Sequence, residues 1–437
     1  MSGADLIGPV PPHWSVKPLR LIGRFLKGSG GSKEDAVEEG VPCVRYGELY
    51  TTHRNFIERA QTCITQERAS DYTPIEYGDV LFAASGETIE EIGKSAVNLL
   101  HGARCGGDVV ILRPTEGFVP RFLGYATDAA PVAAQKSLAG RGSTVKHIYP
   151  DELREVVIAI PPVDEQLAIA EFLDRETARI DALIGAKQRL LDLLAEKRKA
   201  IIATAVTRGL DPKVKLRDSG VPWLGGIPVH WDIRRVRTLS EFITSGPRGW
   251  SERVSGEGSL FIQSGDLNDV LQVEFATAKR VRVDDDAEAA RTRLQDGDIV
   301  VCITGAKTGN VAVCASVPEP AYVNQHLCLV RPNRAVLTVF LGAALKSTVG
   351  QAQLALFQYG LKQGLNLENV REVLIALPAL DEQRAIVEHI ARETAKLDAV
   401  RAATERTIAL LKERRSALIA AAVTGQLDLT TGEGAAA

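Results

Sequence analysis

Apolar residues recur three and four positions apart along two long stretches of the chain, residues 164–207 and 381–424. This period predicts two long amphipathic helices. Neither stretch is apolar all round, so each helix needs a partner helix along its apolar seam, as in a coiled coil. The seam residues are Ile169, Leu173, Ile180, Leu183, Leu190, Leu194 and Ile201 in the first stretch, and Ile386, Ile390, Leu397, Val400, Leu411 and Leu418 in the second.

Residues that favour helix ends flank both stretches. Prolines precede each helix, an aspartate is the predicted N-cap, and a glycine follows the last turn. Two spacer helices are therefore predicted within residues 161–209 and 378–428, each about 65 Å long. The predicted start and stop residues are Pro161-Pro162, Asp164 and Gly209 for the first helix, and Pro378, Asp381 and Gly425 for the second.

Short apolar runs of β-like composition, separated by Gly, Pro and Asp, occupy the rest of the chain. We expect strands at residues 80–82, 109–112, 299–303 and 327–330. They predict two α+β globules, named here globule 1 (residues 1–160) and globule 2 (residues 210–377). Each globule is followed by one long helix. The last residues, 429–437, are expected to be disordered.

The two halves of the chain repeat one another. Residues 164–207 align without a gap with residues 381–424, and 24 of the 44 positions are identical. The same spacing pairs His13-Trp14 with His230-Trp231, which we interpret as structural anchors where each globule begins. The repeat predicts one molecule with two nearly equivalent halves related by approximate two-fold symmetry. Such a molecule suits a bipartite target, and double-stranded DNA is the obvious candidate.

Composition narrows the setting. A chain of 437 residues is long enough for two or three domains, and 24% charged residues with 45% hydrophobic residues are typical of a folded globular protein. The six cysteines form no C-x-x-C pair, and no secretion signal or membrane span is evident, so we expect a cytoplasmic protein. The net charge of −3 shows that any basic DNA-binding face has to be local.

The motifs of common enzymes are missing from the sequence. Gly93-Lys94-Ser95 resembles the end of a phosphate-binding loop, but Thr88 stands where the first glycine of that motif belongs. We find no Asn/Asp-Pro-Pro-aromatic tetrapeptide of the amino-methyltransferases. No cysteine or histidine pair has the spacing of metal ligands, since His326 and Cys328 lie within a strand-like run. The sequence therefore predicts a chain that is not an enzyme and has no metal site.

The doubled arrangement resembles a known family. Each long helix opens with Asp-Glu-Gln after a strand end that contains proline, and each closes on Ala-Val-Thr. Gly-Asp-hydrophobic turns occur at residues 78–80 and 297–299, and the phrase at residues 215–231 joins the two halves. Together these features, from residue 7 to about residue 428, resemble the DNA-specificity subunit of type I restriction–modification systems.

This resemblance implies a non-catalytic DNA reader. Each globule would be a target recognition domain for one half of a split, asymmetric DNA sequence. The helices would pack as an antiparallel coiled coil, set the spacer between the half-sites and dock two DNA adenine methyltransferase subunits. Two restriction/translocase subunits would join them. S-adenosylmethionine, ATP and Mg are then expected on the partner subunits and not on this chain.

Residues that read bases are expected on loops near the glycine turns, because Arg, Asn, Gln and carboxylates match the hydrogen-bonding edges of bases. Lysines and arginines nearby are expected to contact phosphates. The candidates in globule 1 are Arg45, Tyr46, Glu48 and Arg54, with Lys136, Arg141 and Lys146 on phosphates. The candidates in globule 2 are Gln263, Ser264, Asp266 and Asn268, with Arg248, Lys307 and Lys362 alongside. Trp250 is expected to fill the core.

Two other functions fit the helical seams and the repeat. A stand-alone repressor with fused half-site readers would bind its bipartite DNA target tightly and without partners. A helical-hairpin adaptor would bind proteins and give no DNA protection. The Asp-Glu-Gln opening after the proline-bearing strand end favours the specificity subunit over both alternatives.

Overall fold

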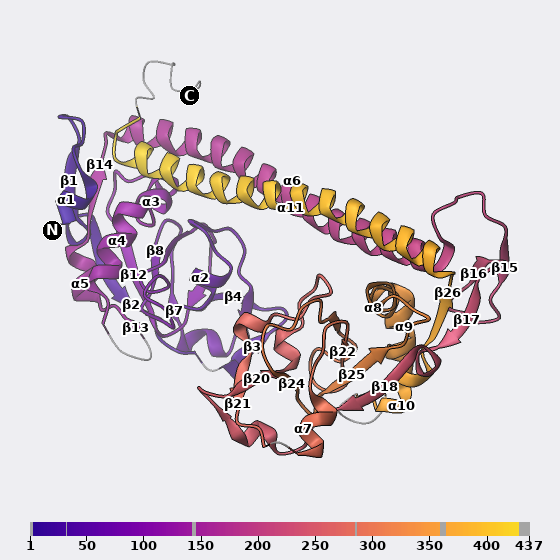
Figure 1. The fold of residues 1–437 in the computed structure, drawn as a ribbon. Helices are drawn as coiled ribbons and strands as arrows, with labels where there is room; N and C mark the ends of the chain where they lie inside the picture. The colour runs from indigo at the N-terminus through magenta and orange to yellow at the C-terminus, as the bar shows by residue number, and fades with distance from the viewer. Residues whose placement is uncertain (1–2, 32, 142–145, 285, 359–363, 428–437) are drawn as a thin grey trace. The chain divides into compact units, whose positions relative to one another are not determined.

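The computed structural model describes residues 3–31, 33–141, 146–284, 286–358 and 364–427. The chain divides into two compact units. Unit 1 comprises Met1–Lys187 and Glu405–Ala437, and unit 2 comprises Gln188–Thr404. Each unit therefore contains one globule and one half of each long helix, α6 (Val163–Arg208) and α11 (Leu380–Val423), as Figure 1 shows.

Both long helices form where the apolar period predicts them. They start one residue before the predicted N-caps, however, because the carbonyl of Pro162 accepts the hydrogen bond from the Gln166 amide at 2.9 Å. Asp164 and its counterpart Asp381 thus lie inside the first turn, and the N-cap prediction was wrong. Their carboxylates still stabilise the positive end of the helix dipole from that position. Gly209 ends α6 at a φ of 73°, in the left-handed conformation that glycine adopts freely.

The helices run antiparallel within each unit. In unit 1, Leu173 of α6 and Ile419 of α11 share one core, while Asp181, farther along α6, accepts a hydrogen bond from Arg415, earlier in α11. In unit 2, Val206 shares a core with Ile386, and Arg198 pairs with Asp398. The contacts advance along one helix as they retreat along the other. The antiparallel packing of the long helices is thereby confirmed in both units.

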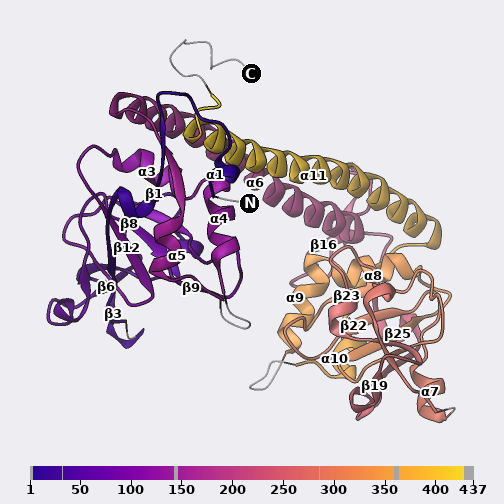
Figure 2. The ribbon, with the colours of Figure 1, turned by 90° about the vertical axis from the view of Figure 1, so that its left-hand side faces the viewer.

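Two five-stranded sheets form the centre of globule 1. Their strand orders are β2-β12-β8-β10-β5 and β3-β6-β4-β11-β7, and the strands β1 and β14 pair where the chain enters and leaves the globule (Figure 1). Strands β8 and β12, which pair in the first sheet, are labelled in Figure 2. Helices α1 (Gly3–Ile7), α2 (Glu48–Thr51), α3 (Pro120–Ala126), α4 (Ala130–Ala139) and α5 (Pro150–Glu155) accompany them. The strands are β1 (Ser15–Pro18), β2 (Gly23–Lys27), β3 (Ala36–Val37), β4 (Val41–Val44), β5 (Phe56–Ile57), β6 (Thr62–Ile64), β7 (Thr73–Pro74), β8 (Val80–Ala83), β9 (Ser85–Gly86), β10 (Ser95–Asn98), β11 (Arg104–Cys105), β12 (Val109–Pro114), β13 (Lys146–His147) and β14 (Val157–Ile160).

Globule 2 repeats this plan with two four-stranded sheets, in the orders β18-β25-β22-β23 and β19-β21-β20-β24. Its helices are α7 (Ala287–Thr292), α8 (Thr338–Lys346), α9 (Thr348–Phe357) and α10 (Leu367–Glu372). The strands are β15 (Leu216–Asp218), β16 (Gly226–Pro228), β17 (Asp232–Arg235), β18 (Ser240–Ser245), β19 (Val254–Ser255), β20 (Ser259–Ile262), β21 (Lys279–Val281), β22 (Ile299–Cys302), β23 (Val311–Val313), β24 (Ala321–Val323), β25 (Leu327–Pro332) and β26 (Leu374–Leu377).

The Gly-Asp-hydrophobic turns have the same function in both globules. Asp79 is buried after the turn at Gly78, where it accepts hydrogen bonds from the Glu76 amide and from the guanidinium of Arg113. Asp298 is buried in the same way and accepts from the Gln295 amide and from Arg331. Each aspartate therefore ties the start of one core strand, β8 or β22, to the end of its neighbour, β12 or β25. The predicted strands and the α+β class are confirmed.

Candidate nucleic-acid interface

A histidine, a tryptophan and a glutamate join the entry of each globule to its long helix. In unit 1, Glu165 accepts hydrogen bonds from Trp14 Nε1 at 2.9 Å and lies 2.8 Å from His13 Nε2. In unit 2, Glu382 makes the same contacts with Trp231 and His230, both at 3.0 Å. The two histidines are exposed at their tips and bound to a carboxylate. The structural role predicted for them is confirmed.

The glutamine of the Asp-Glu-Gln opening fixes each helix to its globule. Gln166 is buried, accepts a hydrogen bond from the Val119 amide at 2.9 Å and donates to the carbonyl of Pro161. Gln383 is equally buried, and it binds the Leu337 amide and the carbonyl of Pro378. A buried amide with both its donor and its acceptor satisfied holds one geometry. This opening thus sets the angle at which the helix leaves the globule.

The base-reading candidates of globule 1 gather around α2. Tyr46 is exposed, and its ring lies 6.3 Å from that of Tyr50. The Glu48 side chain is largely buried, and its carboxylate accepts hydrogen bonds from Thr62 Oγ1 at 2.5 Å and from His53 at 3.4 Å. Arg45 is half-buried at the end of β4. Tyr46 is thus more exposed than Arg45 and Glu48. All of these DNA assignments stay predictions.

The phosphate candidates of globule 1 occupy different surroundings. Lys136 is buried, with Nζ 2.8 Å from the carbonyl of Thr127 and 3.3 Å from the carboxylate of Asp128. Burial lowers the pKa of Lys136 to about 8. The structure therefore does not bring this ammonium to a surface where a phosphate could reach it. Arg141 is exposed and pairs with Glu152, and Lys146 is partly exposed in β13.

The candidates of globule 2 meet at one loop. Gln263, Ser264 and Asp266 lie at a 3-10 turn (Ser264–Asp266), where the Asp266 carboxylate accepts from the Gln263 amide at 2.8 Å and burial raises its pKa. Asn268 accepts hydrogen bonds from two amides of its own loop. Lys307 Nζ lies 3.5 Å from the carbonyl oxygen of Gly265. The Gln263 and Ser264 side chains are thus partly exposed at this loop, and the ammonium of Lys307 lies close to it.

Three further positions complete the predicted set. Arg248 is exposed just before Trp250, which is buried in the core as expected. Lys362 lies outside the described residues. Arg54 is exposed on the side of globule 1 that faces α6, where its guanidinium lies 3.4 Å from the carboxylate of Asp181.

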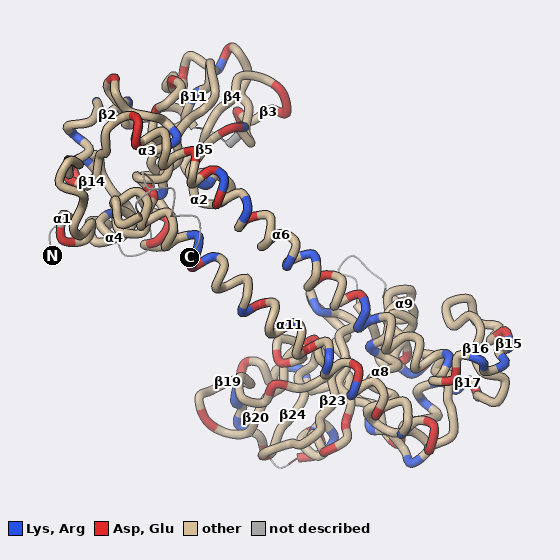
Figure 3. The backbone as a smooth tube through the Cα atoms, turned by 90° about the horizontal axis from the view of Figure 1, so that it is seen from above, with Lys and Arg blue, Asp and Glu red and all other residues tan. Residues whose placement is uncertain are grey.

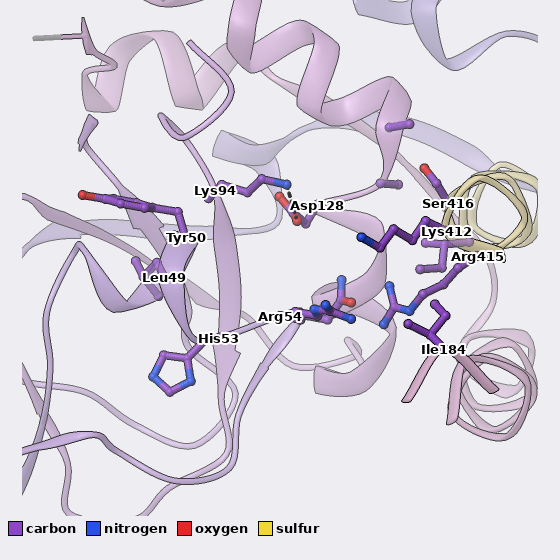
Figure 4. A pocket seen from close by; sticks show the side chains of 14 residues that line it. Leu49, Tyr50, His53, Arg54, Lys94, Asp128, Ile184, Lys412, Arg415 and Ser416 are labelled. Atoms are coloured by element: carbon purple, nitrogen blue, oxygen red, sulfur yellow. Dashed lines mark hydrogen bonds and ion pairs between the residues drawn. The ribbon is translucent and has the colours of Figure 1, made fainter. Parts of the chain in front are cut away.

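A cavity of about 430 Å³ lies within unit 1 between globule 1 and the paired helices. Figure 4 shows that the side chains of Arg54, Lys412 and Arg415 converge on it from the globule and from α11. Lys94 and Asp128 close its far wall. The residues that line it are Leu49, Tyr50, His53, Arg54, Asn55, Lys94, Asp128, Ala129, Ala130, Ile184, Lys412, Arg415, Ser416 and Ile419.

Positive charge dominates this cavity. Asp128 lies between Lys94 at 3.2 Å and Lys136 at 3.3 Å, and Asp181 lies between Arg54 and Arg415. Lys412 is exposed, and within the described part of the chain it forms neither an ion pair nor a hydrogen bond. Of the residues that line the cavity, four are thus lysine or arginine (Arg54, Lys94, Lys412 and Arg415), and one, Asp128, has a carboxylate.

The sequence analysis missed Lys94, Lys412 and Arg415. Lys and Arg residues recur along both long helices, so charge alone does not single out any of them (Figure 3). A signal was present in the repeat, however, because Ala195 stands in α6 at the position that Lys412 occupies in α11.

The described residues contain no group of three or more His, Cys, Asp or Glu side chains that could hold a metal ion. Burial raises the pKa of the Cys43, Cys105 and Cys328 thiols to about 12, so these thiols are not nucleophiles at neutral pH. Within the same described ranges, no helix has the length and apolar composition needed to span a membrane.

Known proteins with similar sequences were found along this chain. Residues 252–405 match the family model of the type I restriction modification DNA specificity domain. The specificity subunit of the type I restriction enzyme EcoKI of Escherichia coli K12 is 22% identical over 98% of this chain and 94% of its own length. The StySPI specificity subunit of Salmonella potsdam is 21% identical over the same shares. Both relatives are similar to this chain along nearly its whole length.

Solved structures share the fold of this chain. A chain from a structure of type I R-M system assembly and conformational transition superposes with a TM-score of 0.69, at 20% identity over 96% of this chain and 100% of that one. The HsdS subunit of Thermoanaerobacter tengcongensis gives a TM-score of 0.51, also at 20% identity, over 96% of this chain and 99% of its own. The family-model match ends at residue 405, beside the end of unit 2 at Thr404. The matched stretch thus covers most of globule 2 and the part of α11 that belongs to unit 2.

Proposed function

We propose that this chain is the non-catalytic, sequence-specific DNA-binding subunit of a type I restriction–modification complex. The observation that carries the proposal is the doubled unit of globule, anchor and helix, together with relatives named as specificity subunits along nearly the whole chain. Adenine-N6 methylation and ATP-dependent translocation and cleavage then belong to partner subunits. S-adenosylmethionine, ATP and Mg are bound there, and the complex works in the cytoplasm.

Each globule reads one half of a bipartite DNA target. The half-sites of such a target have opposite polarity on the duplex, so two like readers need opposite orientations, which an antiparallel helix pair provides. The scaffolds agree in their buried contacts, as the Arg113–Asp79 and Arg331–Asp298 pairs illustrate. Their loops differ in sequence. The two half-sites can therefore differ, and the spacer helices, residues 161–209 and 378–428, fix the unread gap between them.

The helices also offer matching docking positions for two methyltransferase subunits. Leu193 of α6 and its repeat counterpart Leu410 of α11 are 61% and 64% exposed. Leu183 and its counterpart Val400, which the apolar period placed on the seam between the helices, are instead both 46% exposed. Each unit thus presents one residue of each pair, and exposed apolar side chains at equivalent positions favour burial against a partner. Equivalent surfaces in two units support two copies of one partner, which two restriction subunits can join.

Methylome sequencing with and without the gene tests this function. We expect N6-methyladenine in a motif of two short defined blocks around a fixed unspecified gap, and we expect that motif to disappear on deletion. Restoring the gene should restore the motif. A repressor or an adaptor would leave the methylome unchanged, so an unaltered motif after deletion contradicts the proposal.

A further inference from the structure

The basic cavity of unit 1 carries more positive charge than its ion pairs neutralise. Its apolar floor belongs to the core around Ile419, but its cations outnumber the carboxylates in a chain whose net charge is −3. Lys412 is exposed, and no residue in the described part of the chain forms an ion pair or a hydrogen bond with its ammonium. A local excess of positive charge in a concave site attracts anions, because low-dielectric walls focus the field of the charged groups.

The repeat separates the structural part of this cluster from the added part. Arg415 and Asp181 correspond to Arg198 and Asp398 of unit 2, where the same ion pair joins the same two helices. That pair is therefore part of the scaffold. Lys412 corresponds to Ala195, so the helix pair forms without an ammonium at this position. The lysine is a property of unit 1 alone.

We infer that this cavity binds a phosphate group, with Lys412 as the principal ligand and Arg54 and Arg415 beside it. The guanidinium of Arg54 is held only loosely, at 3.4 Å from Asp181, and it is 70% exposed, so it can turn toward an incoming anion. Ammonium and guanidinium groups form short, charge-assisted hydrogen bonds to phosphate oxygens. The phosphate belongs either to the DNA backbone or to free inorganic phosphate. The first source rests on the function proposed above.

The DNA source is tested with the full-length chain and a duplex that carries the motif found by methylome sequencing. The variant is Lys412→Ala, which installs the residue that the repeat has at 195 and should fold normally. The control is Lys27→Ala, which removes an exposed lysine of unit 1 that does not line the cavity. We expect Lys412→Ala to weaken binding about threefold to tenfold near 0.15 M salt and to reduce the slope of log Kd against log salt by about one. The control should match the wild type.

The free-phosphate source is tested by the rise in Tm that inorganic phosphate causes at constant ionic strength. If phosphate raises the Tm of the wild type and of Lys27→Ala but not of Lys412→Ala, while all three bind DNA equally, the ligand is free phosphate. If Lys412→Ala matches the wild type in both assays, the cavity does not bind phosphate and the inference is overturned. The inference is also overturned if Lys27→Ala weakens DNA binding as much as Lys412→Ala does.

The two proposals fail in different ways. A methylome that does not change on deletion removes the function proposed above, and the Tm assay still decides whether the cavity binds phosphate. A methylome that loses its motif on deletion, combined with variants that bind DNA and phosphate like the wild type, removes only the phosphate site.

Discussion

The two units share a scaffold and differ in the polar groups that stand on it. Lys94 precedes β10 in unit 1, and Asn310 precedes the equivalent strand β23 in unit 2. Asp128 follows α3, whereas Lys346 ends the equivalent helix α8. In unit 1 the lysine binds the carboxylate, and in unit 2 Lys346 binds the side chain of Asn310. The cation has thus changed position between the two units.

The next helix shows the same exchange. Gln135 and Gln353 are equivalent because each binds both the amide and the carbonyl of the residue that opens β14 or β26. The residue after Gln135 is the buried Lys136, and the residue after Gln353 is the buried Leu354. Contacts between backbone and side chain at the element ends have stayed the same, while the charges between the elements have changed. The difference teaches that the scaffold tolerates new charges between its elements, and that a buried one such as Lys136 has a carboxylate partner.

The shared part of the scaffold should give the largest effects on mutation. Asp79→Ala and Asp298→Ala each remove the buried carboxylate that pairs with a partly buried arginine, and each opens a Gly-Asp turn; Arg113 keeps only its pair with the exposed Glu76. We expect each to lower the free energy of unfolding of its own unit by about 3 kcal/mol. Urea denaturation with a probe in each unit measures this loss. Asp151→Ala, which breaks an exposed pair, is the control and should cost less than about 0.5 kcal/mol. Similar losses for all three variants would show that the turns are not shared supports.

The sequence predicted this shared part well. The long helices follow from the apolar period, their ends from Gly209 and Gly425, and the core strands from short apolar runs. The parallels Gly78-Asp79 with Gly297-Asp298 and Arg113 with Arg331 were visible as repeated letters. That each aspartate binds its arginine across two strands was not visible, because strand order is a tertiary property that the spacing of two residues does not reveal.

The unit-specific chemistry was harder to predict. Lys136 was assigned to a phosphate because lysines are mostly exposed, but Asp128 and the carbonyl of Thr127 provide a buried site for its ammonium. Nothing in the local sequence shows that α4 turns this residue inward. Lys412 was missed for the opposite reason, since an exposed helical lysine is ordinary until the fold brings Arg54 beside it.

Lys136 offers a pH test of the difference between the units. Lys136→Leu gives unit 1 the residue that unit 2 carries at 354, and Asp128 keeps Lys94 as its partner. The folded pKa of about 8 lies below the ordinary value of 10.5, so the unfolded chain binds more protons between these two pH values. The free energy of unfolding of the wild type therefore rises with pH. Between pH 7 and pH 10 it rises by about 2.5 kcal/mol more than that of the variant.

Urea unfolding of wild type and Lys136→Leu at pH 7, 8, 9 and 10 measures the difference. Taking the difference cancels the opposing effect of the buried thiols, whose raised pKa values lower stability at high pH in both proteins. Curves that stay parallel across the window would show that the buried ammonium keeps its proton when the unit is folded.

The smallest effects should come from the ion pair that joins the two helices in each unit. Arg198→Ala removes the ion pair with Asp398, whereas Arg415→Ala leaves Asp181 with Arg54. These pairs are partly exposed, so we expect Arg198→Ala to cost up to about 1 kcal/mol of unfolding free energy and Arg415→Ala less. In a double-mutant cycle of Arg415→Ala with Arg54→Ala, removing the second arginine should cost more unfolding free energy than removing the first. The reason is that Asp181 loses both of these partners only in the double mutant. If the two losses of unfolding free energy are strictly additive, Arg54 does not replace Arg415 as the partner of Asp181. The Arg54 guanidinium, 3.4 Å from Asp181, could then turn to an anion without weakening the helix pair.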